Sequence, residues 1–151
     1  ENKKNEERLK EISDSVLALT HTISSEEDVK IGTAALLLRE SCIYNSVGGN
    51  TAYDALVEGE ADSEGLASGF KAVCEKLDVE CFVVSGKYER ADHYWNIVKI
   101  ADAYYHVDIS AIGRGSMDTI FKGDSEQQIN YWWDQSEYPG CKGEEIIRKG
   151  Y

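Results

Sequence analysis

The sequence predicts an α+β fold in which N-terminal helices pack on an antiparallel sheet. The N-terminal half carries apolar residues at helical spacing, and three short runs rich in apolar and aromatic residues follow between positions 80 and 109. The last two runs are separated only by Ala101-Asp102-Ala103, a connection short enough for an antiparallel hairpin. Helices followed by consecutive strands are typical of this fold class.

Two helices are predicted before the first break in the pattern. The first covers residues 6–19, where one helical face is apolar and the opposite face carries Glu and Lys. Ser24 followed by Glu27 is a capping-box pattern, which predicts a second helix from there to about Tyr44. The stretch 45–50 contains a Gly-Gly pair and is expected to end this helix.

A third helix is predicted after a short helical or turn segment at residues 51–56. Asp62 and Ser63 are both favourable N-cap residues, and the helix that they open is expected to end at Asp78. The residues on its apolar face are Leu66, Ala67, Phe70, Val73, Cys74 and Leu77.

The strands are predicted over residues 80–85, 93–100 and 104–109, which are rich in β-branched and aromatic residues. After Ser110 the pattern weakens, and loop-forming segments alternate with aromatic ones such as Tyr131-Trp132-Trp133.

No repeat, low-complexity tract or linker separates parts of the sequence, which predicts one domain over residues 1–151. Within it we expect a helical part at 1–44, a core at 45–110 and a loop-rich aromatic tail at 111–151.

Composition argues against several classes of partner. The chain has 151 residues, of which 42% are hydrophobic and 29% charged, as in globular domains. Its net charge of −12 and its lack of clustered Lys and Arg argue against nucleic acid and anionic membranes. No apolar run approaches the roughly 18 residues that a membrane span needs. The oligomeric state is left open.

The cysteines do not predict a metal site. Cys42, Cys74, Cys81 and Cys141 show neither Cys-x-x-Cys spacing nor a local histidine. Their spacing leaves the disulfide state open, and Cys74 and Cys81 occupy apolar positions where a free thiol acts as a small hydrophobe. We predict neither a metal nor another cofactor.

Three segments carry the residues that point to a function. The first runs from Glu58 to Phe70, the second is His93-Tyr94-Trp95-Asn96, and the third is Tyr104-Tyr105-His106-Val107-Asp108. In this order they resemble the bacterial transglutaminase-like family. Its members carry Cys-x-Gly-Tyr-Ala-x-Ala-Phe at a helix start, a His-Ala-Trp-Asn strand and a Trp-Tyr-x-Val-Asp strand.

This resemblance spans about residues 44–109 and implies a papain-like core with a Cys-His-Asp triad. Position by position, the triad falls on Ser63, His93 and Asp108, with serine in place of the cysteine. The resemblance also implies a bacterial secreted or surface protein. Because the sequence begins at Glu1 without a methionine, an upstream signal could have been removed, and we expect an extracellular or cell-surface location.

The positions of these three residues fit nucleophilic chemistry. A helix N-terminus lowers the pKa of a thiol, and its free N–H groups can stabilise an oxyanion. The predicted hairpin can bring Asp108 beside His93, where a carboxylate would fix the tautomer of the imidazole. His93 would then face Ser63 across the seam between helix and sheet. The substrate cleft is expected to be lined by Asp62, Gly65, Tyr94, Trp95 and His106.

Other departures from the family pattern accompany the serine. Asp62 replaces a small or apolar residue, and a carboxylate there would oppose thiolate formation by like-charge repulsion. Tyr94 replaces the alanine of the His-Ala-Trp-Asn motif and is expected to narrow the mouth of the cleft. Taken singly, Ser63 fits a simple helix cap and His93 a partly buried strand residue, so the prediction rests on the spaced set.

Three functions are compatible with this pattern. The first is a catalytically silent domain that binds a peptide or protein, or acts as a scaffold. The second is an acyl-transfer or peptide-hydrolysing enzyme with Ser63 as nucleophile, His93 as base and Asp108 as the orienting carboxylate. The third is a thiol transglutaminase or peptidase in which the natural cysteine at position 63 has been replaced by serine. Neither substrate nor partner is specified by the sequence.

Overall fold

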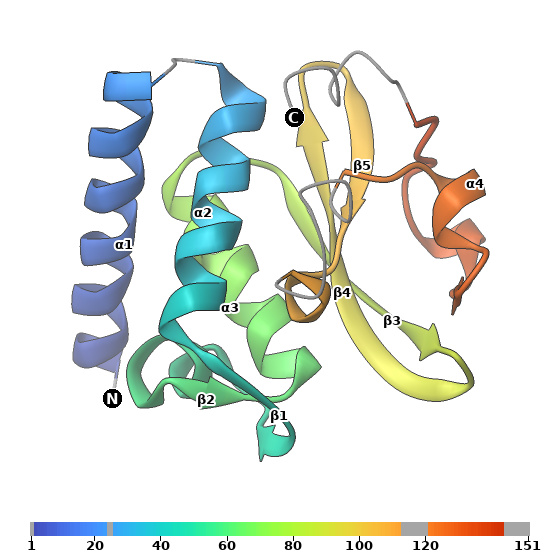
Figure 1. Cartoon of the computed structure of the whole chain (residues 1–151), viewed down its shortest axis with the longest axis horizontal. Coiled ribbons are helices and arrows are strands. Elements are labelled where there is room, and N and C mark those ends of the chain that lie inside the picture. Colours follow the sequence, from blue (N-terminus) through green and yellow to red (C-terminus); the bar gives the residue numbers. More distant parts are fainter. Residues whose placement is uncertain (1, 24–25, 113–120, 144–151) are drawn as a thin grey trace.

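The computed structural model describes residues 2–23, 26–112 and 121–143, and three helices precede its main sheet. They are α1 (Asn2–Ile23), α2 (Glu27–Ser41) and α3 (Ser63–Lys76). Figure 1 shows α1 and α2 side by side, with α3 between them and the strands. The predicted first and third helices are therefore confirmed, and α1 extends beyond residues 6–19 at both ends.

The sheet contains four antiparallel strands in the order β5-β4-β3-β6. These strands are β3 (Cys81–Tyr88), β4 (Ala91–Ile100), β5 (Ala103–Val107) and β6 (Tyr131–Trp132). The β4–β5 hairpin pairs Ile100 with Ala103 and Asn96 with Val107, as the short connection predicts. Helices packed on an antiparallel sheet confirm the predicted fold class.

Side-chain alternation along β4 places residues in two cores. Val98 and Ile100 point toward the helices and join a large cluster that includes Phe70 of α3. Trp95 and Ile97 point to the opposite face and pack in a smaller cluster. Each large apolar side chain buried in this way contributes roughly 1.5–3 kcal/mol to stability.

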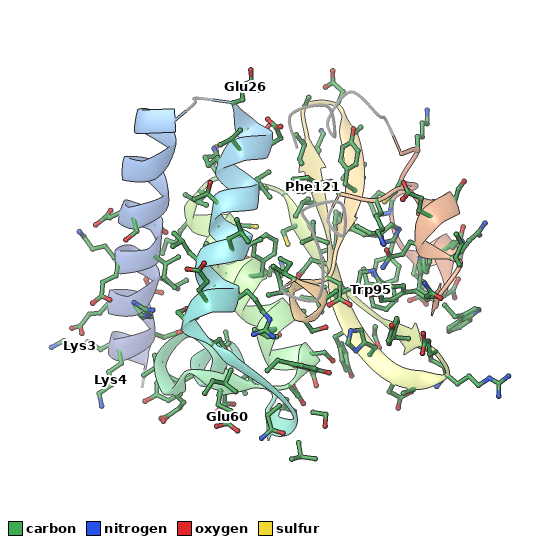
Figure 2. All side chains as sticks on the ribbon, viewed as in Figure 1. Lys3, Lys4, Glu26, Glu60, Trp95 and Phe121 are labelled. Carbon is green, nitrogen blue, oxygen red and sulfur yellow. The ribbon has the colours of Figure 1, made fainter. Side chains whose placement is uncertain are left out.

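The C-terminal segment 121–143 covers the second face of the sheet. Its first element is the short helix α4 (Asp124–Gln127), followed by β6 and a 3₁₀ turn at Gln135–Glu137. Trp133 and Cys141 of this segment complete the smaller cluster. Figure 2 shows Trp95 within the molecule, whereas the charged ends of Lys3 and Glu26 project outward.

The predicted second helix needs two corrections. It begins at Glu27, so Glu26 occupies the cap position without a side-chain cap bond, and Ser24 lies outside the described residues. It ends at Ser41 rather than Tyr44, because strand β1 (Ile43–Gly49) follows.

β1 was not predicted, and it pairs in parallel with β2 (Glu60–Ala61) across a π-helical turn at Asp54–Glu58. The pairing is interrupted, and Val47 between its paired ends is 87% exposed. A strand with an exposed centre lacks the apolar alternation by which strands are found.

All four cysteines are buried and free. Within the described ranges, no helix is both long and apolar enough to cross a membrane.

Candidate functional site

Ser63 is the first residue of α3, and its neighbours fix this end of the helix. Asp62 is the N-cap, and its Oδ1 accepts a hydrogen bond from the Gly65 N–H at 2.9 Å. The Asp62 N–H donates to the carbonyl of Gly49 in β1, also at 2.9 Å. Asp62 rather than Ser63 therefore caps the helix, which leaves the serine hydroxyl for other contacts.

Gly65 is needed for close packing of the chain on itself. A Cβ at this position would lie 2.7 Å from the Gly49 carbonyl oxygen and 2.8 Å from the Ala61 side chain. Gly65 is buried, so its lack of a side chain makes room for β1 and β2. Its expected place in a substrate cleft stays a prediction.

His93 and Asp108 form a buried pair next to α3. The Nε2 atom of His93 lies 2.9 Å from Oδ2 of Asp108, and the two residues are only 7% and 4% exposed. His93 is near the start of β4, whereas Asp108 follows the last residue of β5 and caps the 3₁₀ turn Ile109–Ala111. The strand predicted to reach residue 109 thus ends at Val107, and the turn directs the carboxylate toward His93.

Two further residues hold the Asp108 carboxylate. Oδ1 accepts from the Ser110 hydroxyl at 2.7 Å and from the Ser110 N–H at 3.0 Å. Oδ2 accepts from the Tyr131 hydroxyl at 2.6 Å. Burial opposes ionisation of Asp108, but its contacts with His93, Tyr131 and Ser110 outweigh burial and lower the pKa of the carboxyl.

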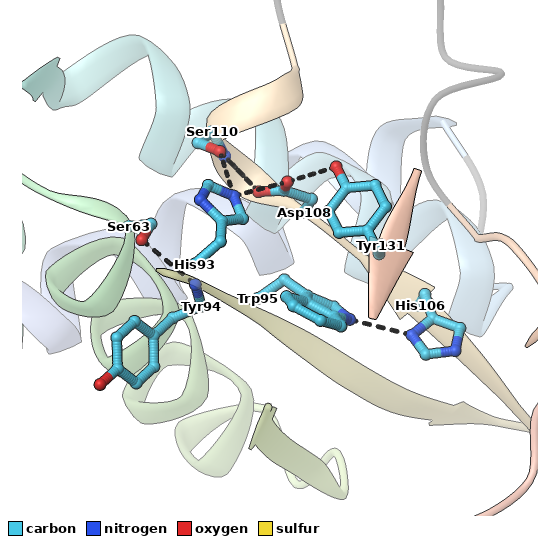
Figure 3. Close-up of polar contacts among 8 residues, drawn as sticks. All are labelled: Ser63, His93, Tyr94, Trp95, His106, Asp108, Ser110 and Tyr131. Atoms are coloured by element: carbon cyan, nitrogen blue, oxygen red, sulfur yellow. Dashed lines mark hydrogen bonds and ion pairs between the residues drawn. The ribbon is translucent and has the colours of Figure 1, made fainter. Parts of the chain in front are cut away.

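These contacts determine the tautomer of His93. The Ser110 hydroxyl donates its single proton to Asp108, so its oxygen, 3.1 Å from His93 Nε2, can only accept. The proton of a neutral His93 ring therefore sits on Nε2, and Nδ1 carries the lone pair. In Figure 3 the ring lies between Ser63 and Asp108, with its second nitrogen on the Ser63 side.

Ser63 itself is engaged by the backbone. Its Oγ accepts a hydrogen bond from the Tyr94 N–H at 3.2 Å. Among the hydrogen bonds of the described residues, none joins Ser63 to His93. The three predicted triad positions thus come together in one region, with Tyr94 contributing its backbone.

No protein-family model matches the sequence, and no curated protein matches it significantly. Among solved structures, one described as "a TGase" matches with a TM-score of 0.64 and 15% identity, over 74% of this chain and 33% of that one. A second, described as "a Putative Cysteine Protease from Cytophaga hutchinsonii", has a TM-score of 0.57 and 14% identity. It covers 89% of this chain and 46% of its own.

This chain has a transglutaminase-like fold. The predicted papain-like architecture is thereby confirmed, and the chain spans less than half the length of either neighbour. At these identities the likeness concerns the fold, and the roles of Ser63, His93 and Asp108 stay predictions.

Trp95 and His106 lie beneath the buried His93–Asp108 pair. They are 0% and 1% exposed, so in this conformation they support the site from within the core and do not line an open cleft. The Trp95 ring stacks on His93 with a centroid separation of 6.3 Å, and its Nε1–H donates to Nδ1 of His106 at 3.0 Å. Nε2 of His106 lies 2.8 Å from Oδ1 of Asp124.

His106 also belongs to a group of three side chains of metal-ligand type. Ligand atoms of His106, Asp124 and Cys141 lie within 4.8 Å of one another. The indole N–H of Trp95 can only donate, so Nδ1 of His106 must carry a lone pair. The proton of the neutral His106 ring is therefore on Nε2, the nitrogen to which a metal would have to bind. Histidine ligands instead donate a proton from their other nitrogen. Burial and the nearby Asp124 also raise the pKa of Cys141, which disfavours a thiolate ligand.

Through these hydrogen bonds, His106, Asp124 and Cys141 connect strand β5 to the C-terminal segment. Oδ2 of Asp124 accepts from the Cys141 N–H at 3.1 Å, while its Oδ1 meets His106. The pKa of His106 is lowered because burial, which opposes its charge, outweighs the contact with Asp124.

Ser110 and Tyr131 belong to the site but do not stand out in the sequence as site residues. The Asp-x-Ser spacing from Asp108 to Ser110 is a local signal for such a turn, since aspartate side chains bond the backbone two residues on. Tyr131 is 23 residues from Asp108, and no local pattern connects the two.

Proposed function

We propose that this transglutaminase-like domain is catalytically silent and serves as a peptide- or protein-binding or scaffolding module. The observation that carries the proposal is the state of Ser63, whose Oγ accepts the Tyr94 N–H while no hydrogen bond of the described residues connects it to His93. A hydroxyl does not ionise near neutral pH, so the resting thiolate–imidazolium pair of a cysteine enzyme cannot form at this position.

The carboxylate of Asp62 supports the same proposal. It caps α3 directly before Ser63 and bonds the Gly65 N–H. A negative charge at this position offsets the positive end of the helix dipole, which would otherwise favour an anionic nucleophile. Asp62 stabilises the helix while making its N-terminus a poorer environment for nucleophilic chemistry.

Ser63-dependent turnover would exclude the silent domain. We would incubate the protein with amine donors and glutamine-containing peptides, and separately with a peptide library, and follow products by mass spectrometry. The proposal predicts that the native protein and Ser63→Ala give the same background level of product. Ser68→Ala is a matched control, because Ser68 lies five positions along the same helix. Product that disappears in Ser63→Ala and persists in Ser68→Ala would overturn the proposal.

Binding has its own test. Amide chemical shifts of the labelled protein would be followed during titration with a library of short random peptides. The proposal predicts saturable shifts at Ser63 and Tyr94 that are lost in Tyr94→Ala. Shifts confined to other surfaces would favour a scaffold that acts elsewhere.

A serine acyl-transfer or hydrolytic enzyme is the second candidate, favoured by the tautomer of His93. With the proton on Nε2, Nδ1 has a lone pair on the Ser63 side of the ring (Figure 3). In such an enzyme, Ser63 Oγ would attack a carbonyl carbon as its proton passed to Nδ1, and the Ser63 N–H would stabilise the oxyanion.

A third candidate is a thiol enzyme whose natural cysteine at position 63 has been replaced by serine. Its support is the retention of His93 and Asp108 around the substituted position. A serine codon at this position of the natural coding sequence would end this candidate.

A further inference from the structure

Among the hydrogen bonds that the Asp108 carboxylate accepts from the described residues, only that of Tyr131 comes from the C-terminal segment. The Tyr131 hydroxyl donates to Oδ2 at 2.6 Å, a length typical of a hydrogen bond to a charged oxygen. We propose that Tyr131 is a positioning residue, which orients the Asp108 carboxylate and through it the imidazole of His93.

The positions of the other donors explain why this hydroxyl matters. Ser110 provides both of its donors to Oδ1, whereas Tyr131 and His93 share Oδ2. Ser110 fixes one oxygen but leaves the carboxylate able to tilt about it. Tyr131 holds the second oxygen at the place where it meets His93 Nε2–H.

The ring of Tyr131 packs separately from its hydroxyl. It lies 6.1 Å from the His93 ring, 5.0 Å from Trp95 and 4.8 Å from Tyr88, measured between centroids. Replacement by phenylalanine would keep these contacts and remove only the oxygen. Tyr131→Phe therefore isolates the positioning contact from the packing.

The backbone around Tyr131 is anchored on the sheet. In β6, Tyr131 pairs with Tyr88 and Trp132 pairs with Lys87 of β3. Gly86 permits this approach, because a Cβ there would overlap the Trp132 carbonyl oxygen and lie 2.7 Å from the Trp95 ring. The hydroxyl is thus presented by an edge strand of the sheet itself.

The experiment follows the His93 Nε2–H proton by NMR in the native, serine-containing protein. Its resonance is assigned by its loss in His93→Gln. We expect a slowly exchanging signal in the native protein. Its solvent exchange should become at least about tenfold faster in Tyr131→Phe, since a hydrogen bond to a charged group contributes a factor of this size.

Two controls separate a specific effect on His93 from a general increase in solvent exchange across the C-terminal segment. Tyr138→Phe removes another hydroxyl of the same segment, one that accepts from the Ser85 N–H at 3.2 Å, and should leave the His93 signal unchanged. The Nε2–H of His106, bonded to Asp124, should stay protected in both variants.

Absence of a protected His93 signal in the native protein would overturn the proposal. An unchanged exchange rate in Tyr131→Phe, or equal acceleration in Tyr138→Phe, would do the same. The measurement involves no reaction at Ser63, so its outcome is independent of whether the domain is silent.

Discussion

Asn96 should hold α3 against the sheet and thereby keep Ser63 next to β4. Its side chain is fully buried, and its Nδ2 donates to the carbonyl of Ala67 in α3 at 3.0 Å and to that of Phe82 in β3 at 3.2 Å. Asn96→Ala removes these two bonds, each contributing about 1 kcal/mol, together with a weaker bond from Nδ2 to Cys81 Sγ at 3.5 Å, and it leaves a small polar cavity. Among the described residues the Oδ1 atom has no hydrogen-bond partner, so its removal offsets part of this loss.

The net expectation is a loss of about 2 kcal/mol in the free energy of unfolding, or about 4–8 °C in Tm for a chain of this length. Urea denaturation followed by circular dichroism measures it. Asn130→Ala is the matched control, since Asn130 is exposed and should change stability by less than about 0.5 kcal/mol. Equal stabilities for the two variants would refute the role assigned to Asn96.

Three other predictions concern the site and the buried groups. Asp108 has a lowered pKa in the folded protein, so its contribution to stability is present above the unfolded value of about 3.9 and is lost as pH falls through the folded value. Asp108→Asn should thus lower the free energy of unfolding by about 2 kcal/mol at pH 7, measured by urea denaturation. The difference between the native protein and the variant should be smaller at pH 3, and an equal difference at both pH values would contradict this. Burial raises the pKa of Cys42, Cys74 and Cys141. These thiols should therefore react with a disulfide reagent at pH 8 only as fast as the protein unfolds. Rapid labelling of the folded protein would contradict their burial. In Ser63→Cys, alkylation of the new cysteine, mapped by mass spectrometry, should persist below the ordinary thiol pKa of about 8.5 if His93 is correctly oriented. An alkylation rate that follows the pH dependence of an ordinary thiol would mean that the site has changed beyond its nucleophile.

The parts of the site that the sequence predicted are those with a local or motif-based signal. The cap preference of Asp62 and the apolar face that follows it locate the start of α3, and therefore Ser63. The two-residue connection after β4, residues 101–102, fixes the hairpin register that brings Asp108 close to His93. Both signals act over short sequence distances, where propensity and turn length determine the geometry.

What the sequence did not predict depends on contacts between distant segments. Tyr131 reaches Asp108 through a strand of two residues, too short to show alternation. Trp95 and His106 were expected beside a cleft, but alternation specifies only the face of a sheet, and here the C-terminal segment covers that face. The close approach of β1 and β2 to Gly65 likewise has no signal in the local sequence.

Reaction with a fluorophosphonate probe tests most directly whether Ser63 is a working nucleophile. The folded protein would be treated with the probe, and adducts located by mass spectrometry, with His93→Gln and heat-unfolded protein as references. The account predicts no adduct at Ser63 above the unfolded background. An adduct at Ser63 that forms in the folded protein and is lost in His93→Gln would contradict it and identify a serine enzyme.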